Sequence, residues 1–479
     1  MLSNINKLLE QIVFKRISSF TEKFNILYDL QFGFRAKHST THTLISLSET
    51  IRSALDNGQV ACGIFKDLQK AFDTVNHEIL LKKMEHYGFR GVINKWLKSY
   101  LTNRTQKVMI NGFTSKSLNI NHGVPQGSVL GPILFLLYIN DLNLTIRHST
   151  TYHFADDTTL FNINSCYKKL QKEVNNDLRS LVIWLTANKI SLNKDKTELI
   201  FFRKPNTIIP LNVRIKLNGK RLTPTNRIKY LGVILDEHLN GNFHCEELVK
   251  KLNRANGMLA KIRHYAPAHD LKNIYYAIFS SHMMYGSQSW SMKLNSVTDK
   301  ISKLQKKAIR IITFSDFRDL TDPLFSQLEI LKFTDNVTLL NCTFVYDYLN
   351  GALPKSFNGI FDKVSDVHRR NTSNSRTGKL VTTSYKSISY GKKTIYRNCI
   401  TSWNYLTSII KDFPSAINSD QTHLSCVTLK RIIKNHFLSL YGKNIESSNQ
   451  FYVKKISTDF MKMTIARSKA PYNRPYSIS

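Results

Sequence analysis

The sequence predicts an α+β fold, with short apolar strands and helices in the first half of the chain and basic amphipathic helices after them. An apolar segment at residues 60–68 has the length of a buried strand, and a helical pattern that ends near Gly88 follows it. Asn-Gly pairs at 111–112 and 218–219 lie between candidate strands, which is the strongest short-range signal for a hairpin. From residue 241 onward, apolar residues recur at helical spacing among lysines and arginines.

The other elements follow from the same patterns. The chain begins with a helix, followed by a loop at 31–39 and a second helix at 40–55. Ser128 can cap an apolar helix that is too short to cross a bilayer. Residues 152–161 alternate like a hairpin with two aspartates at its tip. Further predictions are helices at 166–185, 246–263, 270–285 and 298–312, strands at 198–202 and 228–235, and a mobile basic loop at 365–390.

Composition indicates a polyanionic partner. The chain has 479 residues, and its 68 Lys and Arg against 34 Asp and Glu give a formal net charge of +34. Such an excess suits surfaces that neutralise phosphates. The six cysteines form no Cys-x-x-Cys pair, so we expect reduced thiols and no structural zinc. The sequence carries no export signal, so we expect it to stay on the nucleocytoplasmic side.

Three aspartates are candidates for metal-dependent phosphoryl transfer. Asp67 follows the apolar strand, and Asp156 with Asp157 occupies the tip of the second hairpin. If these strands are adjacent, the carboxylates converge as a two-cation site requires. Taken singly, each has a simpler interpretation: Asp67 as a helix cap, and Asp156 with Asp157 as an acidic turn.

Their companions form an ordered series of motifs. The series is QFGFR (31–35) with KHST (37–40), FKDLQKAFDTVNH (65–77), GVPQGSVLGPILF (123–135), YINDL (138–142), FADDT (154–158), NKDKT (193–197) and YLGV (230–233). It resembles the reverse transcriptases of non-LTR retrotransposons, in particular jockey-like LINE elements, over residues 1 to about 320. The resemblance implies a right-hand polymerase and an RNA-directed DNA polymerase activity.

The resemblance also implies the roles of individual residues. Asp67, Asp156 and Asp157, with the backbone carbonyl of Leu68, would hold two Mg²⁺ ions, for which Mn²⁺ is the alternative. Phe72 stands where the family places the aromatic ring that collides with a ribose 2′-hydroxyl, which favours dNTPs; alone, it reads as a core aromatic.

Other matched positions would contact nucleotides. Pro125, Gln126 and Gly127 match the loop beneath the templating base, and a Pro-Gly turn is compatible with that role. Lys196 matches a lysine implicated in protonating pyrophosphate, with a solvated surface lysine as the alternative. Arg35 and Lys37 would face template or triphosphate, although a charged loop accounts for them equally.

The resemblance divides the chain into partial fingers (1–59), a palm with an antiparallel sheet (60–240), a helical thumb (241–330) and a mainly helical basic region of unknown role (331–479). Because the chain begins within a helix of the family's fingers, it resembles an N-terminally truncated element. Lys66 and Gln69 are further departures from the family.

The expected partners are an RNA template, a DNA primer, dNTPs and the RNA/DNA hybrid, without a membrane, in nucleus and cytoplasm. The alternatives are a catalytically inactive nucleic-acid-binding remnant and an RNA-dependent RNA polymerase.

Overall fold

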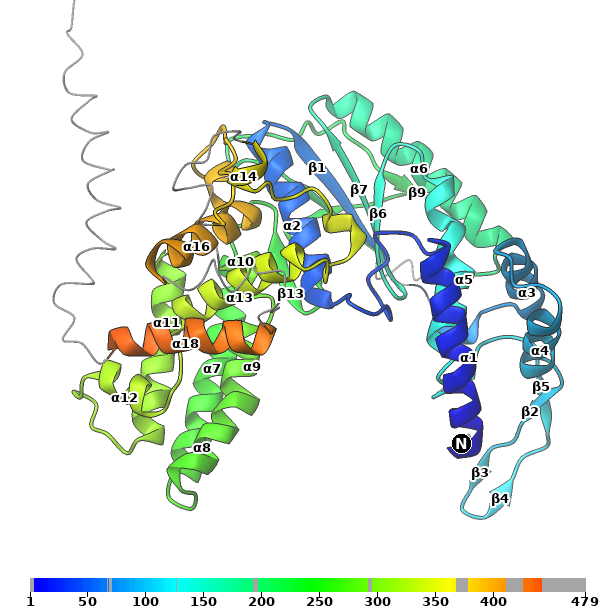
Figure 1. The fold of residues 1–479 in the computed structure, drawn as a ribbon. Helices are drawn as coiled ribbons and strands as arrows, with labels where there is room; N and C mark the ends of the chain where they lie inside the picture. Colours follow the sequence, from blue (N-terminus) through cyan, green and yellow to red (C-terminus); the bar gives the residue numbers. More distant parts are fainter. Residues whose placement is uncertain are drawn as a thin grey trace, which may run out of the picture.

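The computed structural model describes residues 4–66, 68, 71–125, 127–192, 197–291, 295–367, 378–410 and 425–441. It contains helices and a mixed sheet, as the α+β prediction requires. Figure 1 shows an arch with the sheet at its top and two helical arms that hang from it. Of the predicted site residues, Asp67, Gln126 and Lys196 lie outside the described residues.

The central sheet has the strand order β11-β8-β1-β7-β6. Its strands are β1 (Val60–Lys66), β6 (Thr150–Phe154), β7 (Asp157–Asn164), β8 (Glu198–Phe202) and β11 (Pro224–Thr225). The predicted antiparallel sheet is wrong at one edge, because β11 pairs with β8 in parallel. The β9 (Lys216–Leu217) and β10 (Lys220–Arg221) hairpin reverses the chain before β11, and Thr225 Oγ1 then donates to Leu199 O at 3.2 Å.

Two apolar cores cover the two faces of this sheet. Ala61 and Phe65 of β1 belong to one core, together with α2 (Thr40–Asp56). Cys62 and Ile64 alternate with them and belong to the other core. That second core includes α5 (Gly131–Ile139) and the inner face of α6 (Tyr167–Ala187).

The arms are built from helices on either side of the sheet (Figure 1). One arm contains α1 (Asn4–Lys23), α3 (His77–His86), α4 (Val92–Leu101), the β2 (Arg104–Gln106) and β5 (Leu118–Ile120) pair, and the β3 (Met109–Ile110) and β4 (Phe113–Thr114) hairpin. The other contains α7 (Asn242–Ile262), α8 (Ala268–Ile274), η4 (Tyr275–Ser280), α9 (Ser281–Met284), α11 (Asn295–Ile312), α12 (Thr321–Gln327), α13 (Phe333–Leu349), α16 (Ile395–Ile409) and α18 (Cys426–Tyr441). One continuous core joins α2, the sheet and these later helices. The predicted domain boundaries stay predictions.

Several local predictions are confirmed by side-chain caps and turn geometry. Ser128 Oγ accepts from Gly131 N, the first residue of the apolar helix, at 3.0 Å, although the N-cap position itself is Leu130. Asn111 and Gly112 have φ of 50° and 85°, as a two-residue hairpin requires. All six cysteines are free thiols. No helix in the described ranges combines the length and the apolarity that crossing a bilayer would need.

The predicted single strand at 228–235 is wrong, because the segment is a hairpin of β12 (Arg227–Tyr230) and β13 (Val233–Asp236). Its turn places Leu231 and Gly232 at φ of 44° and 81°. Tyr285 Oη donates to Leu231 O at 2.7 Å. A contact from Tyr285, which follows α9 and is more than 50 residues away, therefore holds a turn that the unbroken apolar run does not reveal.

The predicted basic loop at 365–390 is mostly irregular where the structure describes it, and α2 anchors its C-terminal part. The Asp56 carboxylate accepts from Lys386 N at 3.0 Å and from Ser387 N at 2.6 Å. Seven residues earlier on the same helix, Glu49 accepts from Ile395 N at 2.7 Å, at the start of α16. Two carboxylates of α2 thus hold the chain that leads into α16.

Candidate active site

The two aspartates lie at the tip of the β6–β7 hairpin, as predicted. Asp157 is the first residue of β7 and pairs with Phe154, so Ala155 and Asp156 form the turn. Ala155 has φ of 57°, a left-handed conformation uncommon for a residue other than glycine. Asp156 and Asp157 are both half-buried. The hairpin therefore presents two neighbouring carboxylates at the end of the sheet.

The strand that precedes Asp67 runs beside this hairpin. β1 pairs antiparallel with β7, and its last residue, Lys66, is opposite Thr158. The two strands that had to be adjacent for the carboxylates to converge are therefore neighbours. Asp67 itself lies outside the described residues, so its part in the site stays a prediction. Leu68 is buried and forms an isolated bridge with Leu192.

The loop at residues 31–39 is hydrogen-bonded to the Ala155–Asp156 turn. Gln31 Oε1 accepts from Ala155 N at 3.1 Å and from Gly33 N at 2.9 Å. A Cβ on Gly33 would lie 2.3 Å from Ala155 N, so only glycine lets the two backbones approach this closely. Sequence reasoning quoted this motif but missed these roles of Gln31 and Gly33. The glycine inside QFGFR was the available signal.

Phe72 lies in a row of aromatic rings beside the same loop. Its ring centroid is 6.0 Å from that of Phe34, edge to face, and 4.6 Å from that of Phe135. Phe72 is half-buried in the short 3₁₀ helix η1 (Ala71–Asp73). Phe34 is 52% exposed, so one end of the row is open to solvent. The ring is packed on one side, and it is accessible to a bound molecule.

The predicted nucleotide loop is joined to the backbone around Phe72. Val124 N donates to Phe72 O at 2.9 Å, and Gly123 N donates to Val75 O at 2.8 Å. Pro125 is half-buried, and Gly127 is exposed with φ of 75°. The structure thus brings Phe72 and the segment that contains Pro125 and Gly127 together.

Arg35 and Lys37 make local contacts. Arg35 Nη1 donates to Tyr28 O at 2.8 Å and to Gln31 O at 3.2 Å, which ties the loop to its own backbone. Lys37 is exposed, and its Nζ donates to Gly351 O at 3.4 Å. Contact of either residue with template or triphosphate stays a prediction.

The far part of the chain packs on this loop as well. Phe357 is fully buried, and its ring centroid is 6.3 Å from that of Phe32, the residue before Gly33. His42 and Phe344 surround the same ring, at 5.7 and 5.4 Å. A segment of the region predicted without a role therefore contributes to the packing behind the hairpin tip.

Burial strongly perturbs two basic groups near the tip. Burial lowers the pKa of Lys66 to about 7, and the nearby charge of Asp177 opposes this only in part. Burial and the charge of Lys66 lower the pKa of His153 to about 3. His153 is therefore neutral and lies between the hydroxyls of Thr151 and Thr158, at 3.1 Å from each.

Replacing Lys66 by leucine is expected to stabilise the protein. Lys66 is 4% exposed, and its amine has no hydrogen-bond partner in the part of the chain that the structure describes. A buried amine without a partner costs free energy that an aliphatic side chain does not. We expect the free energy of unfolding at pH 7 to rise by about 2 kcal/mol or more. Urea unfolding followed by circular dichroism measures it, and a lower midpoint would contradict the expectation.

The donors in the described part of the site fit a hard divalent cation. Asp156 and Asp157 supply carboxylate oxygens, which Mg²⁺ and Mn²⁺ prefer. No group of three or more His, Cys, Asp or Glu in the described ranges could hold a metal ion, and those ranges leave out Asp67. The described pair therefore needs at least one further ligand.

Comparison with known proteins finds matches to the segment that contains this site. Residues 1–235 match the family described as reverse transcriptase (RNA-dependent DNA polymerase). The probable RNA-directed DNA polymerase from transposon BS of Drosophila melanogaster is 30% identical over 331 residues, which is 65% of this chain and 35% of that protein. The enzyme from the mobile element jockey of the same fly is 26% identical over 349 residues, 70% of this chain and 37% of that protein.

The chain thus spans little more than a third of the length of these relatives. Among solved structures, a telomerase from Candida albicans in complex with a fragment of telomeric RNA aligns with a TM-score of 0.40 at 13% identity. That alignment covers 67% of this chain and 58% of the telomerase.

Proposed function

We propose that this chain, whose residues 1–235 match the reverse transcriptase family, is an RNA-directed DNA polymerase of a non-LTR retrotransposon. It would add dNTPs to a primer 3′-hydroxyl on an RNA template. The observation that carries the proposal is the pairing of β1 with β7, which ends β1 beside the Asp156–Asp157 turn. Two-metal nucleotidyl transfer needs carboxylates from neighbouring strands at one edge of a sheet.

The metal site would combine Asp156 and Asp157 with Asp67 and the carbonyl of Leu68. Two Mg²⁺ ions held there would supply activation of the attacking hydroxyl and stabilisation of the leaving pyrophosphate. The protein's own part is positioning. Gln31 holds the backbone of the turn, so the carboxylates are fixed before substrate arrives.

Selection of the sugar would fall to Phe72. Its ring is packed against Phe135, so it cannot easily move away from a ribose 2′-hydroxyl. The 125–127 loop, joined to the backbone near Phe72 through Val124, would lie under the templating base and would include Gln126. Lys196 would donate a proton to pyrophosphate. Arg35 and Lys37 would act at the rim of the same site.

The arrangement would be a right hand, with the arm of α1, α3 and α4 as part of the fingers and the arm from α7 onward as the thumb (Figure 1). Basic residues of the thumb would hold the RNA/DNA hybrid by its backbone. The chain would act in the nucleus at a target site, after synthesis in the cytoplasm.

The proposal is tested by extension of a DNA primer on an RNA template with Mg²⁺, supplying dNTPs or NTPs. We expect extension with dNTPs only. In the Phe72→Ala variant, we expect the preference for dNTPs over NTPs to fall by about 100-fold, because the steric penalty on the 2′-hydroxyl is lost. Phe317→Ala, which removes an aromatic ring that is 83% exposed between α11 and α12, is the control.

Two outcomes would favour the alternatives. Salt-sensitive RNA binding without extension would identify a binding remnant. Extension with NTPs in preference to dNTPs would identify an RNA-dependent RNA polymerase. Retention of the dNTP preference in Phe72→Ala would remove Phe72 from the proposed site.

A further inference from the structure

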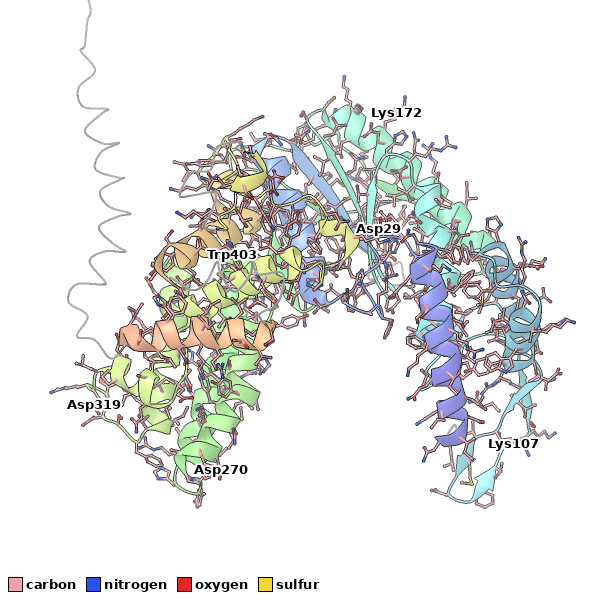
Figure 2. The ribbon with its side chains drawn as sticks, viewed as in Figure 1. Asp29, Lys107, Lys172, Asp270, Asp319 and Trp403 are labelled. Carbon is pink, nitrogen blue, oxygen red and sulfur yellow. The ribbon has the colours of Figure 1, made fainter. Side chains whose placement is uncertain are left out.

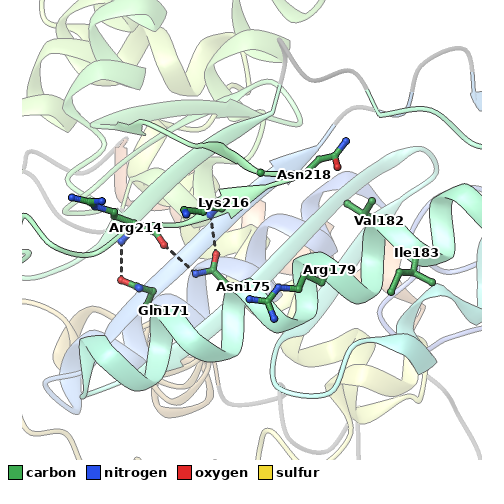
Figure 3. A pocket seen from close by; sticks show the side chains of 9 residues that line it. Gln171, Asn175, Arg179, Val182, Ile183, Arg214, Lys216 and Asn218 are labelled. Atoms are coloured by element: carbon green, nitrogen blue, oxygen red, sulfur yellow. Dashed lines mark hydrogen bonds between the residues drawn. The ribbon is translucent and has the colours of Figure 1, made fainter.

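A hollow on the outer face of α6 is separate from the proposed catalytic site. It has a volume of about 590 Å³ and lies between α6 and the β9–β10 hairpin (Figure 3). The residues that line it include Gln171, Asn175, Arg179, Ile183, Arg214 and Lys216.

Two amide side chains of α6 hold residues 214–216, which lead into β9 and form one wall of the hollow. Gln171 Oε1 accepts from Arg214 N at 2.8 Å. Asn175 Oδ1 accepts from Lys216 N at 2.8 Å, and its Nδ2 donates to Arg214 O at 3.0 Å. The backbone of residues 214–216 is therefore hydrogen-bonded to α6. These bonds fix the positions from which the side chains of Arg214 and Lys216 extend.

The hollow is cationic, and among the residues that the structure describes, no acidic one lines it. Arg179, Arg214 and Lys216 are exposed. The nearby acids of α6 are engaged elsewhere, since Glu173 accepts from the amides of Asn162 and Asn164, and buried Asp177 accepts from backbone N–H groups of Arg147 and His148. The positive charge of the hollow is therefore not neutralised by these acids.

The two ends of the hollow differ in chemistry. Figure 3 shows Arg214 and Lys216 toward one end, Val182 and Ile183 toward the other, and Arg179 between them. Ile183 is 70% exposed, although it stands in a helix whose inner face has a full apolar core. Cations near an exposed aliphatic side chain match a nucleotide, which has a charged phosphodiester and an apolar base face.

We propose that this hollow binds single-stranded RNA, with phosphates at Arg179, Arg214 and Lys216 and bases against Val182 and Ile183. A double helix hides its base faces, so it would leave the aliphatic end without a partner. Figure 2 shows Lys172 of α6 at the top of the arch, opposite the free ends of the arms marked by Lys107 and Asp270. The hollow would thus bind RNA outside the space between the arms. This binding does not depend on polymerase activity.

The test is binding of a fluorescein-labelled single-stranded RNA of about 16 nucleotides to the full chain over a range of salt. For the triple variant R179A/R214A/K216A, we expect at least a tenfold loss of affinity. The slope of log K against log salt should fall by about 2, since each phosphate contact contributes about 0.7. The control R90A/K95A/K98A removes the same charge from the exposed surface around α4.

Equal losses in both triple variants would overturn the proposal, because bulk charge would then account for binding. A second variant, Ile183→Ser, keeps every cation. We expect it to lower the affinity for single-stranded RNA more than the affinity for an RNA duplex of the same length. An equal loss of affinity for both would also overturn the proposal. Extension of a short pre-annealed primer should be unchanged in the hollow variants, which separates this inference from the polymerase assignment.

Discussion

Replacing Asp156 by asparagine is expected to lower primer extension by about 1,000-fold or more, which corresponds to about 4 kcal/mol of transition-state stabilisation. The substitution keeps the shape of the side chain and removes one charged oxygen ligand. Asp156 lies in a turn that Gln31 holds through the neighbouring Ala155 N, so the fold should survive the change. Steady-state extension on an RNA template measures the loss.

The matched control is Asp270→Asn in α8, at the free end of one arm (Figure 2). It removes the same charge from an exposed position far from the hairpin tip and should leave extension unchanged. A second measurement needs no activity. If Asp156 holds a cation, Mg²⁺ should raise the Tm of the wild-type chain and raise it less in Asp156→Asn. An equal rise in both chains would contradict the assignment of Asp156 as a ligand.

Local patterns predicted the strands and the hairpin tip because each is specified by neighbours in sequence. The apolar run before Asp67 gives β1, which ends at Lys66, and the alternation around 152–161 gives β6 and β7 with the two aspartates at the turn. Residues 198–202 form β8 with the predicted bounds. Periodicity and turn chemistry are both short-range signals, so they identify elements of this kind well.

Contacts between distant segments could not be predicted in the same way. Gln31 and Ala155 are 124 residues apart, and nothing in either segment alone shows that they are hydrogen-bonded. The packing of Phe357 on Phe32 belongs to the same class. The turn at Leu231 was missed because a distant residue, Tyr285, holds it. Tertiary contacts decided all three features, and local propensity did not specify them.

Gly33 is the position where such a long-range contact has the largest expected consequence. An alanine Cβ there would lie 2.3 Å from Ala155 N and 3.0 Å from the carbonyl carbon of Phe154. Backbone atoms cannot rotate away as a flexible side chain can, so either the loop or the hairpin tip must shift. A shift of about 1 Å at a catalytic group costs about 100-fold in rate. We therefore expect Gly33→Ala to lower extension by about 100-fold.

The loss of extension in Gly33→Ala depends on whether the loop at residues 31–39 or the turn at Ala155–Asp156 moves to make room for the new Cβ. If the loop moves, the hydrogen bond from Ala155 N to Gln31 Oε1 lengthens, and overpacking of this kind costs about 1–3 kcal/mol of stability. If the turn moves, Asp156 and Asp157 move with it. Both routes lower activity, but only the second also raises the Mg²⁺ concentration needed for half-maximal extension. Measuring that concentration together with the Tm therefore distinguishes them.

Gly257→Ala is the matched control, because it makes the same chemical change inside α7 where a new Cβ meets nothing within 4 Å. Alanine in a helix interior is more favourable than glycine by about 0.5–1 kcal/mol, so this variant should be slightly more stable and fully active. If Gly33→Ala lowers stability and Gly257→Ala raises it, the loss in Gly33→Ala comes from the contact between Gly33 and Ala155. Wild-type extension and stability in Gly33→Ala would instead mean that the loop does not hold the turn that bears Asp156.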